Sequence, residues 1–222
     1  MTERTDQKQA AWNHYFEHGN PVMALMLWVQ KKLLMPQFVK IIQPYLMAGD
    51  SVLEAGCGTA MSTINLAKTT KIKAFGLDLS NEALIRATTL ARQNDVDFTA
   101  IFGNIESMPF PDNKFRLVWN QGLLEHFDHP VAILHEMARV AEIVFVAVPR
   151  KTTLRFFVQK VKAMFGLAAD DIFYLYTEDQ LVDIIKSEPS LAFKSSGSFN
   201  VLGIFSWTWV CGVKLKNNLP NQ

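Results

Sequence analysis

A glycine turn after one apolar segment, with an acidic residue at the end of the next, constrains this chain most. The turn is Val52-Leu-Glu-Ala-Gly-Cys-Gly-Thr-Ala60, in which Gly56 and Gly58 let the backbone bend tightly and approach a ligand. Asp78 follows about 20 residues later, at the end of the apolar segment 74–77. A carboxylate there accepts hydrogen bonds from both hydroxyls of a ribose that lies across the strand ends. The pattern predicts a nucleoside site on a doubly wound sheet.

The residues around the two glycines narrow the choice of nucleoside. A dinucleotide fingerprint needs a third glycine three residues after Gly58, but Met61 stands there. A phosphate-binding P-loop needs a Gly-Lys-Ser/Thr ending, which the sequence lacks. Glu54 repels a pyrophosphate and favours a cationic ligand. A nucleoside without phosphate and with a positive centre is S-adenosylmethionine (SAM), which we expect as the cofactor.

Four segments together resemble a known family. The segments 52–60, 76–80 and 103–115 are similar, in order and spacing, to successive motifs of class I SAM-dependent methyltransferases, and 123–127 continues the match. The likeness is to the small-molecule branch called methyltransferase type 11, and it covers residues 45–150. It implies an α/β fold, a Rossmann-like seven-stranded doubly wound sheet with an antiparallel C-terminal strand pair.

Apolar segments alternate with helical patterns, which is typical of a parallel sheet with helices on both faces. Ser80 or Asn81 is expected to cap the helix that follows Asp78. The family's Lys-Pro-Gly-Gly-like turn before the fifth strand is missing, because Arg139-Val-Ala-Glu-Ile143 leads straight into it. We expect strands at 51–55, 72–77, 97–102, 115–120 and 143–148, helices at 60–69, 81–93, 130–141 and 177–187, and closing strands at 192–199 and 204–216.

Length and composition predict one domain over residues 1–222, since 49% apolar residues suffice for a sizeable core. We expect a SAM-binding core at 48–150 and a closing helix and strands at 177–216. The N-terminal helical cap at 1–47 and a substrate-side insertion at 151–176 fall outside the common core. Ligands of this fold lie beyond the carboxyl ends of the strands, so both segments are expected to shape the substrate pocket.

Charge and cysteine content limit the partners and the location that we expect. The net charge is +1 with no long basic run, so no nucleic-acid partner is expected. The two cysteines imply no disulfide framework, and the polar N-terminus lacks a signal peptide's apolar segment, so a cytoplasmic location is expected. The apolar run 22–29 is shorter than the ~20 residues that cross a bilayer. It indicates a buried cap helix or a lid, with membrane contact as a minor alternative, and the oligomeric state stays open.

The resemblance also implies the cofactor contacts. The family more often has Asp at position 104, but the Asn104 amide still accepts a hydrogen bond; the alternative is a turn residue bonded locally. For Gln121 the alternative is simple exposure to solvent. By resemblance, Glu54, Ala55, Gly56 and Gly58 surround the methionine end, Asp78 holds the ribose hydroxyls, Leu79 lies against the adenine, Asn104 and Ile105 meet the adenine edge, and Gln121 contacts the methionine moiety.

Methyl transfer from a sulfonium is an in-line displacement, so the enzyme chiefly positions the acceptor and excludes water. His126 is a candidate base or substrate contact, since imidazole titrates near neutrality; the alternative is a structural role. Tyr15 is a candidate for covering the methyl group through its aromatic face, or else packs the N-terminal helix. His14 and His18 have the spacing of metal ligands, but no third ligand is evident, so no metal is expected.

These features predict SAM-dependent methyl transfer to a small, apolar or aromatic metabolite, at oxygen, nitrogen or carbon. Methylation of a membrane lipid or quinone is one alternative. A non-catalytic SAM-binding partner protein is another, and an NAD-dependent oxidoreductase is the least favoured.

Overall fold

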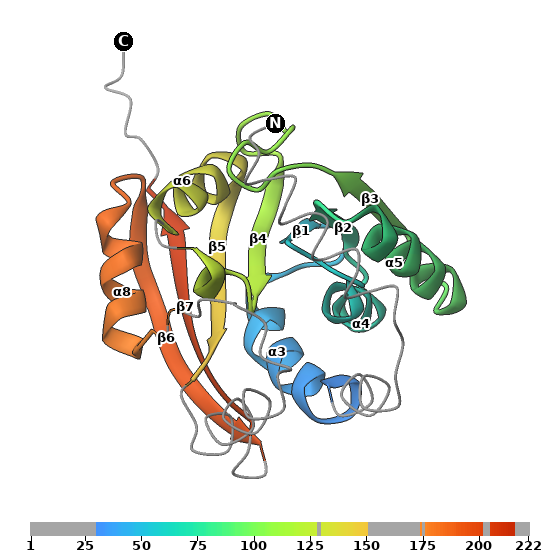
Figure 1. Ribbon diagram of the computed structural model, residues 1–222, viewed down its shortest axis with the longest axis horizontal. Coiled ribbons are helices and arrows are strands. Elements are labelled where there is room, and N and C mark those ends of the chain that lie inside the picture. Colours follow the sequence, from blue (N-terminus) through green and yellow to red (C-terminus); the bar gives the residue numbers. More distant parts are fainter. Residues whose placement is uncertain (1–29, 128–129, 151–173, 175, 202–204, 216–222) are drawn as a thin grey trace, which may run out of the picture.

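The structure, a computed structural model, describes residues 30–127, 130–150, 174, 176–201 and 205–215. Its centre is a seven-stranded sheet in the order β3-β2-β1-β4-β5-β7-β6 (Figure 1). The strands from β1 to β5 pair in parallel, whereas β7 runs antiparallel to both β5 and β6. This confirms the predicted doubly wound sheet with its antiparallel C-terminal pair. The strands are β1 (Ser51–Ala55), β2 (Lys73–Asp78), β3 (Phe98–Phe102), β4 (Phe115–Gln121), β5 (Ala141–Pro149), β6 (Leu191–Val201) and β7 (Phe205–Lys214).

Helices cover both faces of the sheet (Figure 1). One face carries α3 (Met35–Ile42), α4 (Met61–Thr70) and α5 (Asn81–Gln93). The other face carries α6 (Pro130–Val140) and α8 (Glu178–Ser187). Shorter turns are a π-helix at Gln30–Leu34 and 3₁₀ helices at Gln43–Tyr45 and Leu124–His126. Within the described ranges, none of the helices has the length and apolar character needed to span a bilayer.

The sheet is buried because its central strands are apolar on both faces, as parallel sheets require. In β5 every residue from Ile143 to Pro149 is buried. Helix α3 buries one face, with Met35, Phe38 and Ile42 at helical spacing. The Phe38 ring lies edge-on to Trp207 at 5.3 Å between centroids, so α3 is packed against the closing strand pair.

The strand order reverses between β1 and β4, and ligands of such sheets bind at the carboxyl ends beside that point. Helix α5 has the predicted bounds, and the Ser80 side chain caps it by accepting the Ala83 N–H. Strand β5 begins two residues before the predicted start at 143, because α6 ends at Val140 and passes directly into the sheet. Most of the predicted cap at 1–47 and of the insertion at 151–176 lies outside the described residues.

A capping box begins α8, and its contribution to stability can be measured. Thr177 Oγ1 accepts the Gln180 N–H at 3.2 Å, and Gln180 Oε1 accepts the Thr177 N–H at 2.8 Å. We expect Thr177→Ala to lower the free energy of unfolding by about 1 kcal/mol in urea titrations, since the helix loses its N-cap. Thr89→Ala, at an exposed position inside α5, is the matched control and should be neutral or stabilising. Equal losses in the two variants would contradict the capping role.

Candidate active site at the strand ends

The glycine turn is fastened to the end of β2. Gly56 N–H and Cys57 N–H both donate to the Leu77 carbonyl, at 2.8 and 3.0 Å. Gly56 and Gly58 have φ values of +68° and +50°, which favour glycine. A Cβ at Gly56 would lie 2.7 Å from Leu123 Cδ1. The turn therefore needs its glycines, both for backbone conformation and for close packing.

Asp78 stands at the end of β2 and holds the turn from the other side. Its Oδ2 accepts the Gly58 N–H at 2.8 Å, and its Oδ1 accepts the Ser80 N–H at 2.9 Å. Burial raises the pKa of Asp78 above its usual value, although these N–H groups oppose the shift. A carboxylate has about four acceptor positions, so each oxygen retains a lone pair for a further donor, such as a ribose hydroxyl.

Glu54 is buried beneath the turn, on the side of α4. Its Oε2 accepts the Thr63 N–H at 3.3 Å, and Thr63 Oγ1 accepts the Trp119 indole N–H at 2.9 Å. Burial raises the pKa of the Glu54 carboxyl to about 8, hydrogen bonds from Thr63 oppose the shift, and the charge of Asp78 adds to it. Among the described residues, neither of these carboxyls forms an ion pair. This part of the sheet edge suits a cationic ligand.

The first turn of α4 adjoins the glycine turn. Ala60 precedes the helix with φ +50° and provides no side-chain cap, and the first helical turn has no acidic residue. The positive end of the helix is thus suited to an anionic group. Ser62 Oγ donates to Gln121 Oε1 at 2.6 Å, which joins this helix to the end of β4. Gln121 is half-buried and hydrogen-bonded, and its contact with the methionine moiety stays a prediction.

The loop after β3 reaches the same edge. Gly103 N–H donates to the Asp78 carbonyl at 3.1 Å. Asn104 Oδ1 accepts the Glu106 N–H at 3.0 Å, so the local bond of a turn residue is present. The NH₂ group at the other end of that amide is a donor that a base could accept from. The Ile105 side chain is buried in the core, whereas Asn104 is half-buried, and their contact with an adenine stays a prediction.

The remaining candidates are placed as follows. Ala55 is buried at the end of β1, and Leu79 is half-buried between β2 and α5. His126 ends the 3₁₀ helix after β4, is half-buried, and donates its N–H to the Leu123 carbonyl at 3.1 Å. Tyr15 lies outside the described residues. Within the part of the chain that is described, no cluster of three metal-ligating side chains occurs.

Sequence patterns alone did not identify Ser62 or Thr63 as parts of this site. The signal was a pair of hydroxyl residues in the first turn of the helix that follows the glycine turn, and both are buried. A separate surface hollow lies between α3 and α4 and shares no residue with the strand ends; its lining includes Met35, Val39, Lys40, Asn65 and Thr69.

The central part of the chain is similar in sequence to known proteins. Residues 52–142 match the family model for a methyltransferase domain. A 27-O-demethylrifamycin SV methyltransferase of Amycolatopsis mediterranei (strain S699) is 32% identical over 97 residues, which are 43% of this chain and 36% of that protein. A ubiquinone/menaquinone biosynthesis C-methyltransferase of Bdellovibrio bacteriovorus is 31% identical over 129 residues, 56% of this chain and 52% of that protein. The chain thus spans about a third to a half of these curated relatives.

Among solved structures, the fold is similar to magnesium protoporphyrin IX methyltransferase from Synechocystis PCC 6803 with bound SAH. The TM-score is 0.68 at 17% identity, over 89% of each chain. At this level of identity the likeness supports the fold alone.

The raised pKa of Glu54 predicts a pH dependence of stability. Because the folded-state pKa of about 8 exceeds the ordinary value of 4.5, this carboxyl stabilises the fold most below 4.5. That contribution is lost as the pH rises through about 8. We expect Glu54→Gln to become more stable than the wild type by about 1–3 kcal/mol at pH 9, measured by urea unfolding without ligand. Exposed Glu106→Gln is the control and should follow the wild type. A constant difference between Glu54→Gln and wild type from pH 5 to 9 would contradict the assignment.

Proposed function

Because residues 52–142 match the family model for a methyltransferase domain, we propose that this chain transfers the SAM methyl group to a small, apolar or aromatic metabolite. The acceptor atom is oxygen, nitrogen or carbon. The observation that carries the proposal is the glycine turn held against β2, with the half-buried Asp78 carboxylate beside it. The family cofactor is SAM, and the residues at the strand ends suit its ribose, its methionine end and its adenine.

Each part of the cofactor has a matching group. The lone pairs that Asp78 retains suit the two ribose hydroxyls. The first-turn N–H groups of α4 other than that of Thr63, which Glu54 already binds, suit the methionine carboxylate, and Gln121 lies beside that helix to contact the same moiety. Asp78, and Glu54 once a nearby cation lowers its raised pKa, provide a negative potential that suits the sulfonium and the ammonium. Leu79, Asn104 and Ile105 follow β2 and β3, where an adenine attached to that ribose would lie.

SAM supplies a methyl group on a sulfonium, which is already a good leaving group. The task of the protein is to position the acceptor in line with the carbon–sulfur bond and to exclude water. His126 is proposed to accept the proton that a hydroxyl or amine acceptor releases as the new bond to carbon forms. Tyr15 is proposed to cover the methyl group. Both roles rest on sequence position and on family resemblance.

The substrate-side segments are proposed to decide which acceptor enters. In this scheme residues 1–222 form one domain, and 48–150 bind the cofactor while 177–216 close the sheet. Segments 1–47 and 151–176 cover the strand ends and shape an apolar substrate pocket. The names of two relatives, a 27-O-demethylrifamycin SV methyltransferase and a ubiquinone/menaquinone biosynthesis C-methyltransferase, support a small-molecule acceptor. A cytoplasmic location is proposed because the two cysteines imply no disulfide framework.

Methylation of a membrane quinone or lipid is the second candidate. Two observations favour it: the similarity to a ubiquinone/menaquinone C-methyltransferase and the apolar run 22–29 followed by Lys31 and Lys32. Flotation with vesicles, without detergent, separates the two candidates. A chain that floats with quinone-containing vesicles acts at a membrane, whereas one that stays in the dense fraction acts on a dissolved metabolite.

Transfer itself is tested with SAM labelled in the methyl group and fractionated metabolite extracts. The expected result is label in an extractable small molecule together with stoichiometric S-adenosylhomocysteine (SAH). Binding of SAM without formation of SAH in any fraction would favour the non-catalytic alternative. A thermal shift with NAD and none with SAM would revive an oxidoreductase.

Asp78 provides the sharpest prediction for the cofactor site. We expect Asp78→Ala to weaken SAH binding by about 1.5–3 kcal/mol, or roughly 10- to 100-fold, in isothermal titration, because two charge-assisted hydrogen bonds to ribose are lost. Asp50→Ala is the matched control, since its carboxylate also caps a turn, accepting the Met47 N–H at the opposite end of the sheet. This control should bind SAH like the wild type. Unchanged affinity in a folded Asp78→Ala variant would place the ribose elsewhere.

A further inference from the structure

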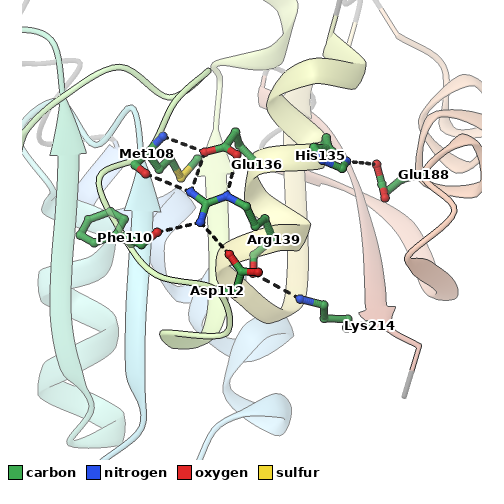
Figure 2. A network of polar contacts seen from close by, with 8 residues as sticks. All are labelled: Met108, Phe110, Asp112, His135, Glu136, Arg139, Glu188 and Lys214. Atoms are coloured by element: carbon green, nitrogen blue, oxygen red, sulfur yellow. Dashed lines mark hydrogen bonds and ion pairs between the residues drawn. The ribbon is translucent and has the colours of Figure 1, made fainter. Parts of the chain in front are cut away.

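The loop at 103–114, between β3 and β4, carries Asn104 and Ile105, the two residues proposed to contact the edge of the adenine. It contains no helix or strand. Its first residue is tied to β2 by the hydrogen bond from Gly103 N–H to the Asp78 carbonyl. The rest of the loop needs another support. That support comes from the last turns of α6, whose Arg139 is hydrogen-bonded to Met108 and Phe110 (Figure 2).

All three guanidinium nitrogens of Arg139 in α6 form hydrogen bonds, and two of these nitrogens bind the loop (Figure 2). Nη1 donates to the Phe110 carbonyl at 2.7 Å and to Asp112 Oδ1 at 2.9 Å. Nη2 donates to the Met108 carbonyl at 3.0 Å and to Glu136 Oε2 at 2.8 Å. Nε donates to Glu136 Oε1 at 2.7 Å. All five N–H donors of the guanidinium are therefore used, and three of them reach the loop.

Glu136 completes the contact from the other side. Its Oε2 also accepts the Met108 N–H at 2.8 Å, so one loop residue is held through both its N–H and its carbonyl. The Arg139 guanidinium is the main cause that holds the pKa of Glu136 below its usual value. A planar, bidentate arginine–carboxylate pair fixes direction as well as distance, which a lysine ammonium does not.

Helix α6, which carries Arg139, is firmly attached to the sheet. Helix α6 buries Ile133, Leu134, Met137 and Ala138 against the sheet. No loop separates α6 from β5, and the carbonyl of Arg139 accepts both the Asn113 N–H at 3.0 Å and Lys214 Nζ at 3.2 Å. The guanidinium thus attaches the loop to the C-terminal end of α6, which is itself bound to β7.

The held part of the loop is packed against the residues that would meet the base. Met108 is 4% exposed and Ile105 is 5% exposed, and both belong to the core cluster that contains Leu77. The Asn104 carbonyl accepts the Ser107 N–H at 3.2 Å, directly before Met108. A displacement of Met108 would therefore move Asn104 and Ile105.

We propose that Arg139, together with Glu136, is a positioning residue for adenine recognition. It fixes loop 103–114, and the loop in turn places Asn104 and Ile105 where they would contact the edge of the adenine. The inference rests on the proposed SAM site. Arg139 itself touches no cofactor in this scheme and acts through the loop. Its loss weakens the selection of adenine over other bases, beyond any loss of fold stability.

The test compares SAH with S-inosylhomocysteine, which differs only at the base edge. Isothermal titration measures both ligands with the wild type, Arg139→Lys and Arg139→Ala. We expect the wild type to prefer SAH, and the preference to fall by roughly tenfold, the worth of one hydrogen bond, in both variants. Hydrogen exchange in 103–112 should become faster in parallel. Arg86→Lys is the matched control, because Arg86 donates Nε to Glu82 on the exposed face of α5, and it should keep the wild-type preference.

The outcomes are distinct. An unchanged preference in a folded Arg139→Lys variant overturns the positioning role while leaving the proposed function intact. A wild type that binds neither ligand overturns the proposed function and this inference with it. If the Arg139 variants do not fold, Glu136→Gln gives the same measurement, since its single amide oxygen can replace only one of the two carboxylate oxygens that bind Arg139 and Met108. A preserved preference there also overturns the proposal.

Discussion

The attachment of the glycine turn to the end of β2 is the interaction on which the rest of the site depends. Two N–H groups of the turn donate to the Leu77 carbonyl, and a third, from Gly58, donates to the Asp78 carboxylate. These bonds bring the ends of β1 and β2 into one fixed arrangement before any ligand arrives. A site built from strand ends in this way needs little reorganisation on binding, which favours affinity.

Glu54, which is buried, and Asp78, which is half-buried, lower the stability of the fold but suit the proposed cofactor. Glu54 lies among Thr63, Trp119 and the turn, and its burial favours the protonated form. Asp78 keeps its charge more easily because backbone N–H groups solvate it. A cation placed between them would favour ionisation of both. The same carboxyls that destabilise the fold at high pH would therefore favour the sulfonium of the proposed cofactor.

Local patterns were sufficient for much of the fold. The apolar run before the turn predicted β1, and the apolar periodicity after Ser80 predicted α5 with the correct bounds and cap. The start of β5 was placed two residues late, because a helix that runs directly into a strand leaves no turn signal. The seven-stranded sheet with its antiparallel C-terminal pair followed from the family resemblance and not from periodicity.

Long-range contacts could not be predicted in this way. The bond between Ser62 and Gln121 joins positions far apart in the chain, as does the contact of Arg139 with Met108. Nothing in the local sequence distinguishes Arg139 from an exposed arginine in the last turn of a helix. The roles of His126 and Tyr15 depend on the acceptor, and they stay predictions.

The most direct test of the central claim is a crystal structure of the chain grown with SAH. The account predicts both ribose hydroxyls within about 3.2 Å of the Asp78 carboxylate, with the methionine carboxylate at the start of α4. Density for SAH away from the strand ends, with Asp78 bonded only to Gly58 and Ser80, would contradict it.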